Sequence, residues 1–129
     1  MKIEDQTKTP SGEVLLQRGY DLLAAGSAAE AAQAFRAAIA TGPEDSETCR
    51  EAHHGLVRAL RDAGRLEQSV AAALALTALT PQDPLAHTAL AISLQHAGHV
   101  PEAEAASARA RVLEWKQQLA LPPDGDELR

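Results

Sequence analysis

Aromatic residues are almost absent from this 129-residue sequence, in which Phe, Tyr and Trp occur once each. Strands favour aromatic and β-branched residues, whereas the hydrophobic share of this chain consists mostly of Ala and Leu, which are strong helix formers. The composition therefore argues against a β-sandwich or barrel and predicts an all-α protein. The length suits one domain with one core.

Cysteine and positive charge are also scarce. The single Cys49 cannot form an internal disulfide, and it lacks the further cysteines of a structural zinc site, which fits a reducing compartment. The net charge is -6 and the pI is near 5.3. Binding to nucleic acid or to an anionic membrane surface needs clustered positive charge, so we expect neither partner.

Long hydrophobic runs are missing as well. No window approaches 18 uncharged apolar residues, and the first ten residues lack the apolar segment of a signal peptide. We therefore expect a soluble, cytoplasmic protein. The excess of Arg over Lys in such an Ala-rich chain is typical of GC-rich bacterial genomes.

An internal repeat organises the chain. Three stretches read Leu-x-x-Ala-Gly and end at Gly26, Gly64 and Gly98, so the glycines are 38 and 34 residues apart. Pro43 and Pro81 are again 38 residues apart, so two independent markers share one period. The extra four residues of the first interval fall in a polar, turn-forming stretch, where an insertion costs little.

Each of these glycines follows an apolar stripe at helical spacing and precedes a second helical stretch, which predicts six helices in three hairpins. Several residues mark helix starts. Ser27 and Glu30 predict a capping box, Asp83 precedes Pro84 at a first helical position, and Pro101 opens the last helix. The second helices of the hairpins are expected near residues 28–41, 66–79 and 101–120.

The first hairpin resembles the tetratricopeptide repeat (TPR), whose signature spaces Trp-x2-Leu-Gly-x2-Tyr, then Ala-x3-Phe, then Pro. Leu15 stands in the place of the signature's Trp. The matching residues are Gly19, Leu22, Ala31, Phe35 and Pro43.

The other two hairpins carry the resemblance with departures, so that it covers about residues 12–119. His53 and His87 replace the Trp, and we expect both rings to fill core space. Trp115 stands where the third proline would stop the last helix. The positions that fit are Leu56, Leu60 and Pro81 in the second repeat and Leu90, Leu94 and Ala103 in the third.

The resemblance implies a short right-handed α-solenoid of three TPR-like hairpins, stacked so that neighbouring repeats bury a continuous core. We expect flexible tails at residues 1–11 and 121–129. The TPR-like domain is expected at residues 12–120, with repeats at about 12–45, 50–83 and 84–119.

The positions of the second helices that face the next repeat become polar along the chain. They are Ala32 and Ile39, then Val70 and Thr77, and finally Glu104 and Arg111. The sequence therefore predicts that the stack ends with a polar face after the third repeat.

The resemblance further implies a groove lined by the first helices, on the stripe opposite their core stripe. Such a groove predicts a non-enzymatic adaptor that binds a segment of a protein or peptide partner and needs no cofactor. The chaperone-binding members of the family clamp a carboxylate with Lys, Arg and Asn, which this chain lacks at those positions. The predicted groove residues are Leu16, Tyr20, Leu23, His54, Arg58, Arg61, Ile92, Gln95 and His96.

Two features of this stripe suggest binding. Leu16, Tyr20, Leu23 and Ile92 place apolar groups where solvated ones are expected, and exposed apolar clusters often mark binding sites. Two arginines, at positions 58 and 61, can bind a carboxylate of the partner. The alternative for each residue is an ordinary solvated helix face, with an ion pair from position 58 to position 62.

The last helix carries a separate apolar stripe at Val112, Trp115 and Leu119. We expect it to fold against the third hairpin as a partial cap, because exposing Trp is costly. This predicts a monomer. The alternative is a homodimer, in which the chain is a self-associating subunit of a larger assembly.

Signals of enzymatic chemistry are scarce. No phosphate-binding loop, His-Glu-x-x-His motif or nucleophile context occurs, so we expect no enzyme and no catalytic residue. Cys49 is interpreted as a small residue within a helix rather than a reactive thiol. A metal site using Cys49, His53, His54 and His87 is the least favoured alternative, because their spacing matches no closed ligand set.

Overall fold

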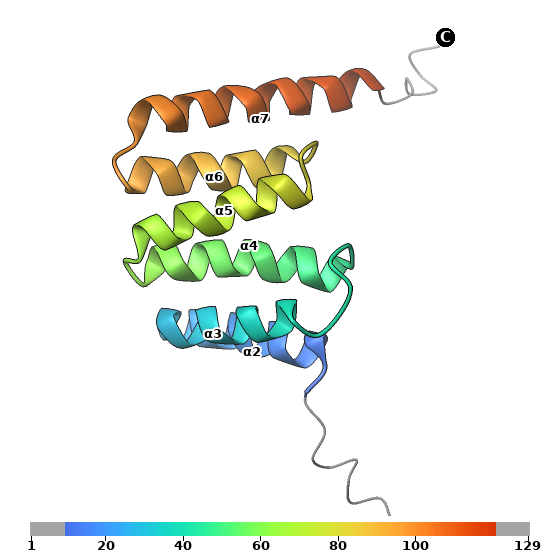
Figure 1. Cartoon of the computed structure of the whole chain (residues 1–129), viewed down its shortest axis with the longest axis vertical. Helices are drawn as coiled ribbons and strands as arrows, with labels where there is room; N and C mark the ends of the chain where they lie inside the picture. Colours follow the sequence, from blue (N-terminus) through green and yellow to red (C-terminus); the bar gives the residue numbers. More distant parts are fainter. Residues whose placement is uncertain (1–9, 121–129) are drawn as a thin grey trace, which may run out of the picture.

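Six helices connected by short turns stack along one axis in the computed structural model, which describes residues 10–120 (Figure 1). The predicted all-α fold of three helix hairpins is confirmed. The predicted tails lie outside the described residues, apart from Pro10 and Ser11. The helices are α2 (Gly12–Ala24), α3 (Ala28–Ile39), α4 (Glu47–Asp62), α5 (Leu66–Leu79), α6 (Pro84–His96) and α7 (Val100–Ala120).

The turn inside each hairpin is closed by the repeated glycine. Gly26 has a φ of +84°, a left-handed conformation that an L side chain rarely adopts. The Ser27 N–H donates to the Leu22 carbonyl at 2.8 Å, and the Gly26 N–H donates to the Leu23 carbonyl at 3.0 Å, which is the Schellman arrangement. The same pair of bonds closes the turns at Gly64 and Gly98.

The predicted capping box at Ser27 and Glu30 is wrong, and the turn explains why. A capping box needs the Ser27 N–H for the Glu30 side chain, but this N–H already closes the preceding helix. The Ser27 side chain makes no capping bond at the start of α3. The predicted start at Asp83 is confirmed, because its carboxylate accepts a bond from the Leu85 N–H at 3.0 Å.

The core of the first two hairpins is built around Phe35, which is fully buried. Its ring lies against Gly19 of α2 and Gly55 of α4. A Cβ atom built on either glycine would come within 2.6 Å of the ring. Glycine on both neighbours therefore lets one aromatic side chain fill the space between three helices. Ala31 and Ala38, which the repeat pattern requires to be small, are also buried.

A buried hydrogen-bonded pair joins the second and third hairpins. The hydroxyl groups of Ser69 on α5 and Ser93 on α6 are 2.6 Å apart, and both residues are fully buried. The Ser69 hydroxyl also donates to the Val57 carbonyl at 3.1 Å. Both polar groups are thus satisfied within an otherwise apolar cluster that includes Leu76, Leu90 and Leu94.

The prediction that the apolar stripe of α7 folds against the third hairpin as a partial cap is wrong. Val112, Trp115 and Leu119 are 41%, 62% and 68% exposed. The buried face of α7 consists of Ala103, Ala106, Ala110 and Leu113, on the other side of the helix. A residue turns about 100° from the one before it, so the apolar stripe points away from the third hairpin. The end of α7 also extends past α6 (Figure 1).

The expectation that His53 and His87 fill the core is also wrong, because both are only partly buried. A ring nitrogen of His87 lies 2.9 Å from the carbonyl of Pro81, in the turn between α5 and α6. His53 borders a depression of about 400 Å³ beside the alanine-rich face of α5, including Ala72 and Ala75. These small side chains do not extend far enough to enclose the ring.

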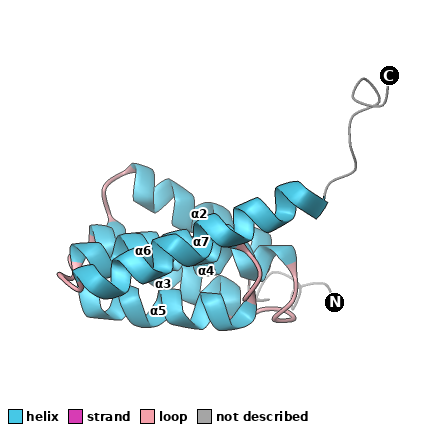
Figure 2. Cartoon of the chain, turned by 90° about the horizontal axis from the view of Figure 1, so that it is seen from above, coloured by secondary structure: helices cyan, strands magenta, loops and turns pink. Residues whose placement is uncertain are grey.

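The first helices of the hairpins form one continuous row. α2 contacts α4 and α4 contacts α6, whereas within residues 10–120 no contact joins α3 to α5 or α5 to α7. Figure 2 views the molecule along the stack, with α7 crossing its end. Among the described helices, none has the length and apolar character needed to cross a membrane.

Candidate functional site

The exposed side of α2, α4 and α6, here called the first-helix face, carries the nine predicted groove residues. The structure divides them into two groups. Leu16 and Leu23 are partly buried and pack against the first core cluster, so they contribute less free apolar surface than predicted. His54 and Arg61 are also partly buried. The exposed residues are Tyr20, Arg58, Ile92, Gln95 and His96.

Tyr20 links the first two repeats on this face. Its ring meets Phe35 edge-on, with 5.4 Å between centroids, and its hydroxyl donates to the Glu51 carboxylate at 3.4 Å. Burial and the negative charge of Glu51 raise the pKa of Tyr20 above its ordinary value. The phenol therefore stays protonated, and its oxygen can still accept a hydrogen bond from a ligand. Its side chain remains 39% exposed.

The two arginines of α4 differ in their surroundings. Arg58 is exposed and pairs with Asp62, with 3.6 Å between Nε and Oδ2, so the ion pair considered as an alternative is present. Exposed pairs of this kind are weak and can exchange for a ligand carboxylate. Arg61 is partly buried and donates from Nη1 to the Ser93 hydroxyl at 3.4 Å, and burial lowers its pKa. Arg61 thus connects two repeats.

His54 and Asp83 form a second connection between the repeats, with 3.9 Å between Nε2 and Oδ2. Burial lowers the pKa of His54, and the Asp83 carboxylate opposes this change without cancelling it. His54 is therefore mostly neutral at neutral pH, and the contact strengthens only when the ring gains a proton.

Helix α6 supplies the most apolar part of the face. Leu85 is 63% exposed and Ile92 is 38% exposed, and they are seven residues apart on one side of the helix. A ring nitrogen of His96 lies 2.9 Å from the Ile92 carbonyl. The first-helix face therefore runs from Tyr20 on α2, past the two arginines of α4, to the exposed aliphatic side chains of α6.

The connections made by Ser93 and Asp83 were not anticipated from the sequence. One signal was available for Ser93, which stands at a core position in the run Leu90, Ala91, Ile92, Ser93, Leu94. A polar residue on a buried stripe indicates a hydrogen-bonded partner inside the fold. No comparable signal identified the partner of His54, because it lies in the turn before the next helix.

The residues weighed for metal or thiol chemistry are separated in the structure. Within residues 10–120, no three His, Cys, Asp or Glu side chains converge in a way that could hold a metal ion. His54 contacts Asp83, whereas His87 contacts a carbonyl. Cys49 is buried, and burial raises the pKa of its thiol, which is the direction opposite to activation.

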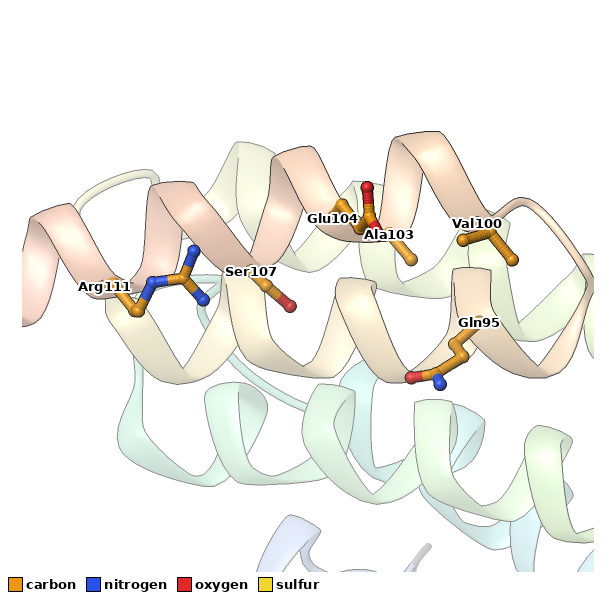
Figure 3. A pocket seen from close by; sticks show the side chains of 6 residues that line it. All are labelled: Gln95, Val100, Ala103, Glu104, Ser107 and Arg111. Carbon is orange, nitrogen blue, oxygen red and sulfur yellow. The ribbon is translucent and has the colours of Figure 1, made fainter.

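A hollow of about 470 Å³ lies between α6 and α7 at the end of the stack and is here called the end groove (Figure 3). Gln95 reaches it from α6, and the other five lining side chains come from α7. Glu104 and Arg111, which the sequence placed on a polar end face, are both among them. The lining residues are Gln95, Val100, Ala103, Glu104, Ser107 and Arg111.

A comparison with protein families matches residues 22–92 to the tetratricopeptide repeat model, which is more than half of the chain. The match begins in α2 and ends in α6, so it spans the turns at Gly26 and Gly64. No curated protein matches the sequence.

Proposed function

Because the chain belongs to the tetratricopeptide repeat family, we propose that it is a non-enzymatic adaptor that binds a segment of a partner protein on the first-helix face. Tetratricopeptide repeats generally mediate interactions between proteins. The observation that carries the proposal is the exposure of Tyr20, Arg58 and Ile92 along one row of adjoining helices.

The chemistry of the face favours a particular kind of segment. Tyr20 and Ile92 offer apolar contact area at the two ends, and Arg58 between them can exchange Asp62 for a carboxylate of the ligand. A peptide with an acidic residue between apolar residues matches this order. Because Arg61 and His54 already connect the repeats, the surface is held in place before binding, which limits the entropy that binding must overcome.

The affinity follows from the size and polarity of such a surface. The interface is small and partly polar, so we expect a dissociation constant of order micromolar. No cofactor or catalytic group takes part in this proposal. The interaction serves to bring the partner together with other molecules.

The test is affinity capture with two matched double variants. Arg58→Glu with Ile92→Ser reverses one charge and removes one apolar group on the first-helix face. Arg109→Glu with Leu74→Ser makes the same changes on exposed positions of α7 and α5. We expect a partner that the wild type and the α7/α5 variant retain and that the face variant loses by more than tenfold, with all three equally helical.

Equal retention by both variants would refute binding on this face. A partner retained by the face variant and lost by the α7/α5 variant would place the interaction on the second helices instead.

A second candidate is self-association through the last helix, and the exposure of Val112, Trp115 and Leu119 favours it. An exposed Trp on a three-residue apolar stripe is uncommon on a monomer surface. If this stripe pairs two copies, the sedimentation coefficient rises with concentration, and Trp115→Ala abolishes the rise. A rise that persists in this variant would refute the candidate.

A further inference from the structure

The end groove corresponds to the surface of each earlier hairpin against which the first helix of the next hairpin packs. A shift of 72 residues carries Gly26 to Gly98 and relates the first hairpin to the third. Under this shift, the six residues of the end groove correspond to a surface of α2 and α3 that contacts α4. The corresponding residues of the first hairpin are Leu23, Ala28, Ala31, Ala32, Phe35 and Ile39.

We propose that the end groove receives α2 of a second copy of this chain, so that copies stack head to tail and continue the solenoid. In the first two repeats the occupant of this position is the first helix of the following hairpin. The first helix that begins a new copy is α2. The side of α2 that corresponds to the packed side of α4 has no hairpin before it within the described residues.

The side of α2 that would enter the groove is exposed and carries two charged residues. α4 packs against the preceding hairpin with Ala52, Leu56 and Ala59, all of which are buried. The 38-residue period places Val14, Arg18 and Asp21 at the same positions of α2, and all three are exposed. The start of the stack therefore carries charged residues at two of the three positions where the repeat pattern is apolar.

The charged residues on this side of α2 and the polar residues of the end groove complement each other in pairs. Leu56 lies in one apolar cluster with Ala32, and their counterparts are Arg18 and Glu104, which carry opposite charges. Neither of these two charged residues forms an ion pair with another described residue.

A second pair agrees with the first. Arg61 donates to Ser93 between the second and third hairpins at 3.4 Å. The counterparts of these two residues are Gln95 in the end groove and Asp21 on α2, which can form the same kind of bond. Two complementary pairs of side chains therefore favour α2 of this chain, rather than an unrelated helix, as the occupant of the end groove.

The predicted contact joins two different surfaces of each copy, so it does not close on itself and produces short chains of copies. The first-helix faces of successive copies would then form one longer row. Because the contact depends on opposite charges near the surface, added salt should weaken it.

The test is sedimentation velocity over a range of about 10 to 500 µM, where a weak contact of this size is measurable. We expect the weight-average sedimentation coefficient of the wild type to rise with concentration. Glu104→Arg and Arg18→Glu should each abolish this rise, since each places like charges at the contact. An equimolar mixture of the two variants should restore it, because the groove of one variant then meets α2 of the other with opposite charges.

Three results for the wild type and the charge variants would overturn the proposal. They are a wild type that sediments as a monomer throughout the range, single variants that associate like the wild type, and a mixture that fails to recover association. Val112→Ser serves as the control, since Val112 lies on the last-helix stripe (Val112, Trp115 and Leu119) and is turned about 80–100° around α7 from Glu104 and Arg111. Loss of association in that variant would assign the contact to the last-helix stripe instead. Circular dichroism checks that all variants keep the wild-type helix content.

Discussion

Phe35 is fully buried in contact with two glycines on neighbouring helices, and neither glycine position leaves room beside the ring for a Cβ atom. This arrangement explains why the only Phe of the chain occurs in the first repeat, where Gly19 and Gly55 flank it. The corresponding residues of the later repeats are the smaller Ala73 and Ser107. A single large ring is thus used where two glycines make room for it.

Gly55→Ala should destabilise the protein, although Ala favours helices over Gly by about 1 kcal/mol. The new Cβ would lie 2.5 Å from two ring atoms of Phe35, and overpacking of this kind costs about 1–3 kcal/mol. The free energy of unfolding in urea measures the net loss. In the Phe35→Leu background, which lacks those ring atoms, the same substitution should cost less or stabilise. An equal loss in both backgrounds would contradict the packing argument.

The pH dependence of stability should reveal the two partly buried histidines of α4. Burial lowers the pKa of both His53 and His54 below their ordinary 6.5. The unfolded chain therefore binds more protons than the folded one below about pH 6.5, and stability falls as the pH decreases through this window. Urea unfolding at about pH 7.5, 6.5 and 5.5 measures the slope.

The double variant His53→Gln with His54→Gln should lose stability less steeply over the same pH range. Surface residue His96→Gln is the control, since its ring is exposed. An unchanged slope in the double variant would show that other groups cause the dependence.

At the scale of single helices, α7 has two apolar stripes with different roles. Leu113 is 2% exposed, whereas Trp115, two residues later, is 62% exposed. Leu113→Ala should lower the free energy of unfolding by about 2–5 kcal/mol, because it leaves a cavity. Trp115→Ala should change it by about 0.5 kcal/mol or less in dilute solution. A large loss for Trp115→Ala at low concentration would mean that the stripe packs within one copy.

Most of the helices could be predicted from the sequence because the glycine period fixes the turns. The turn at Gly26 needs a positive φ, and only glycine adopts it without strain, so the residue type carries the structural information. The predicted second helices agree with α3, α5 and α7 to within two residues at each end. Predictions that depended on a local backbone conformation succeeded for this reason.

Predictions that depended on which surface lies opposite a side chain succeeded less often. The sequence identified the stripe at Trp115 but not its direction, which is set by the opposite, alanine-rich face of α7 packing against α6. The size of His53 suggested a core position, but the facing alanines of α5 leave it at an edge. Similarly, Leu16 and Leu23 were assigned to the groove by angle alone, and the core cluster covers them in part.

At the scale of the whole molecule, three repeats are near the minimum for a stable stack. Both of its ends are polar, and one side of the first helices carries apolar and charged groups that the core does not use. This arrangement buries the apolar core and leaves two surfaces available for binding other molecules. The first-helix face suits a partner segment, and the end groove suits another copy.

The most direct measurement is site-specific photocrosslinking in cells of the source organism, with a photoreactive phenylalanine analogue placed at Tyr20, at Ile92 or at Leu74. The first two positions lie on the first-helix face, and the third is an even more exposed position on α5. We expect one partner to crosslink from Tyr20 and Ile92 and not from Leu74. Crosslinks to that partner from Leu74 alone would contradict the proposal that the first-helix face binds it.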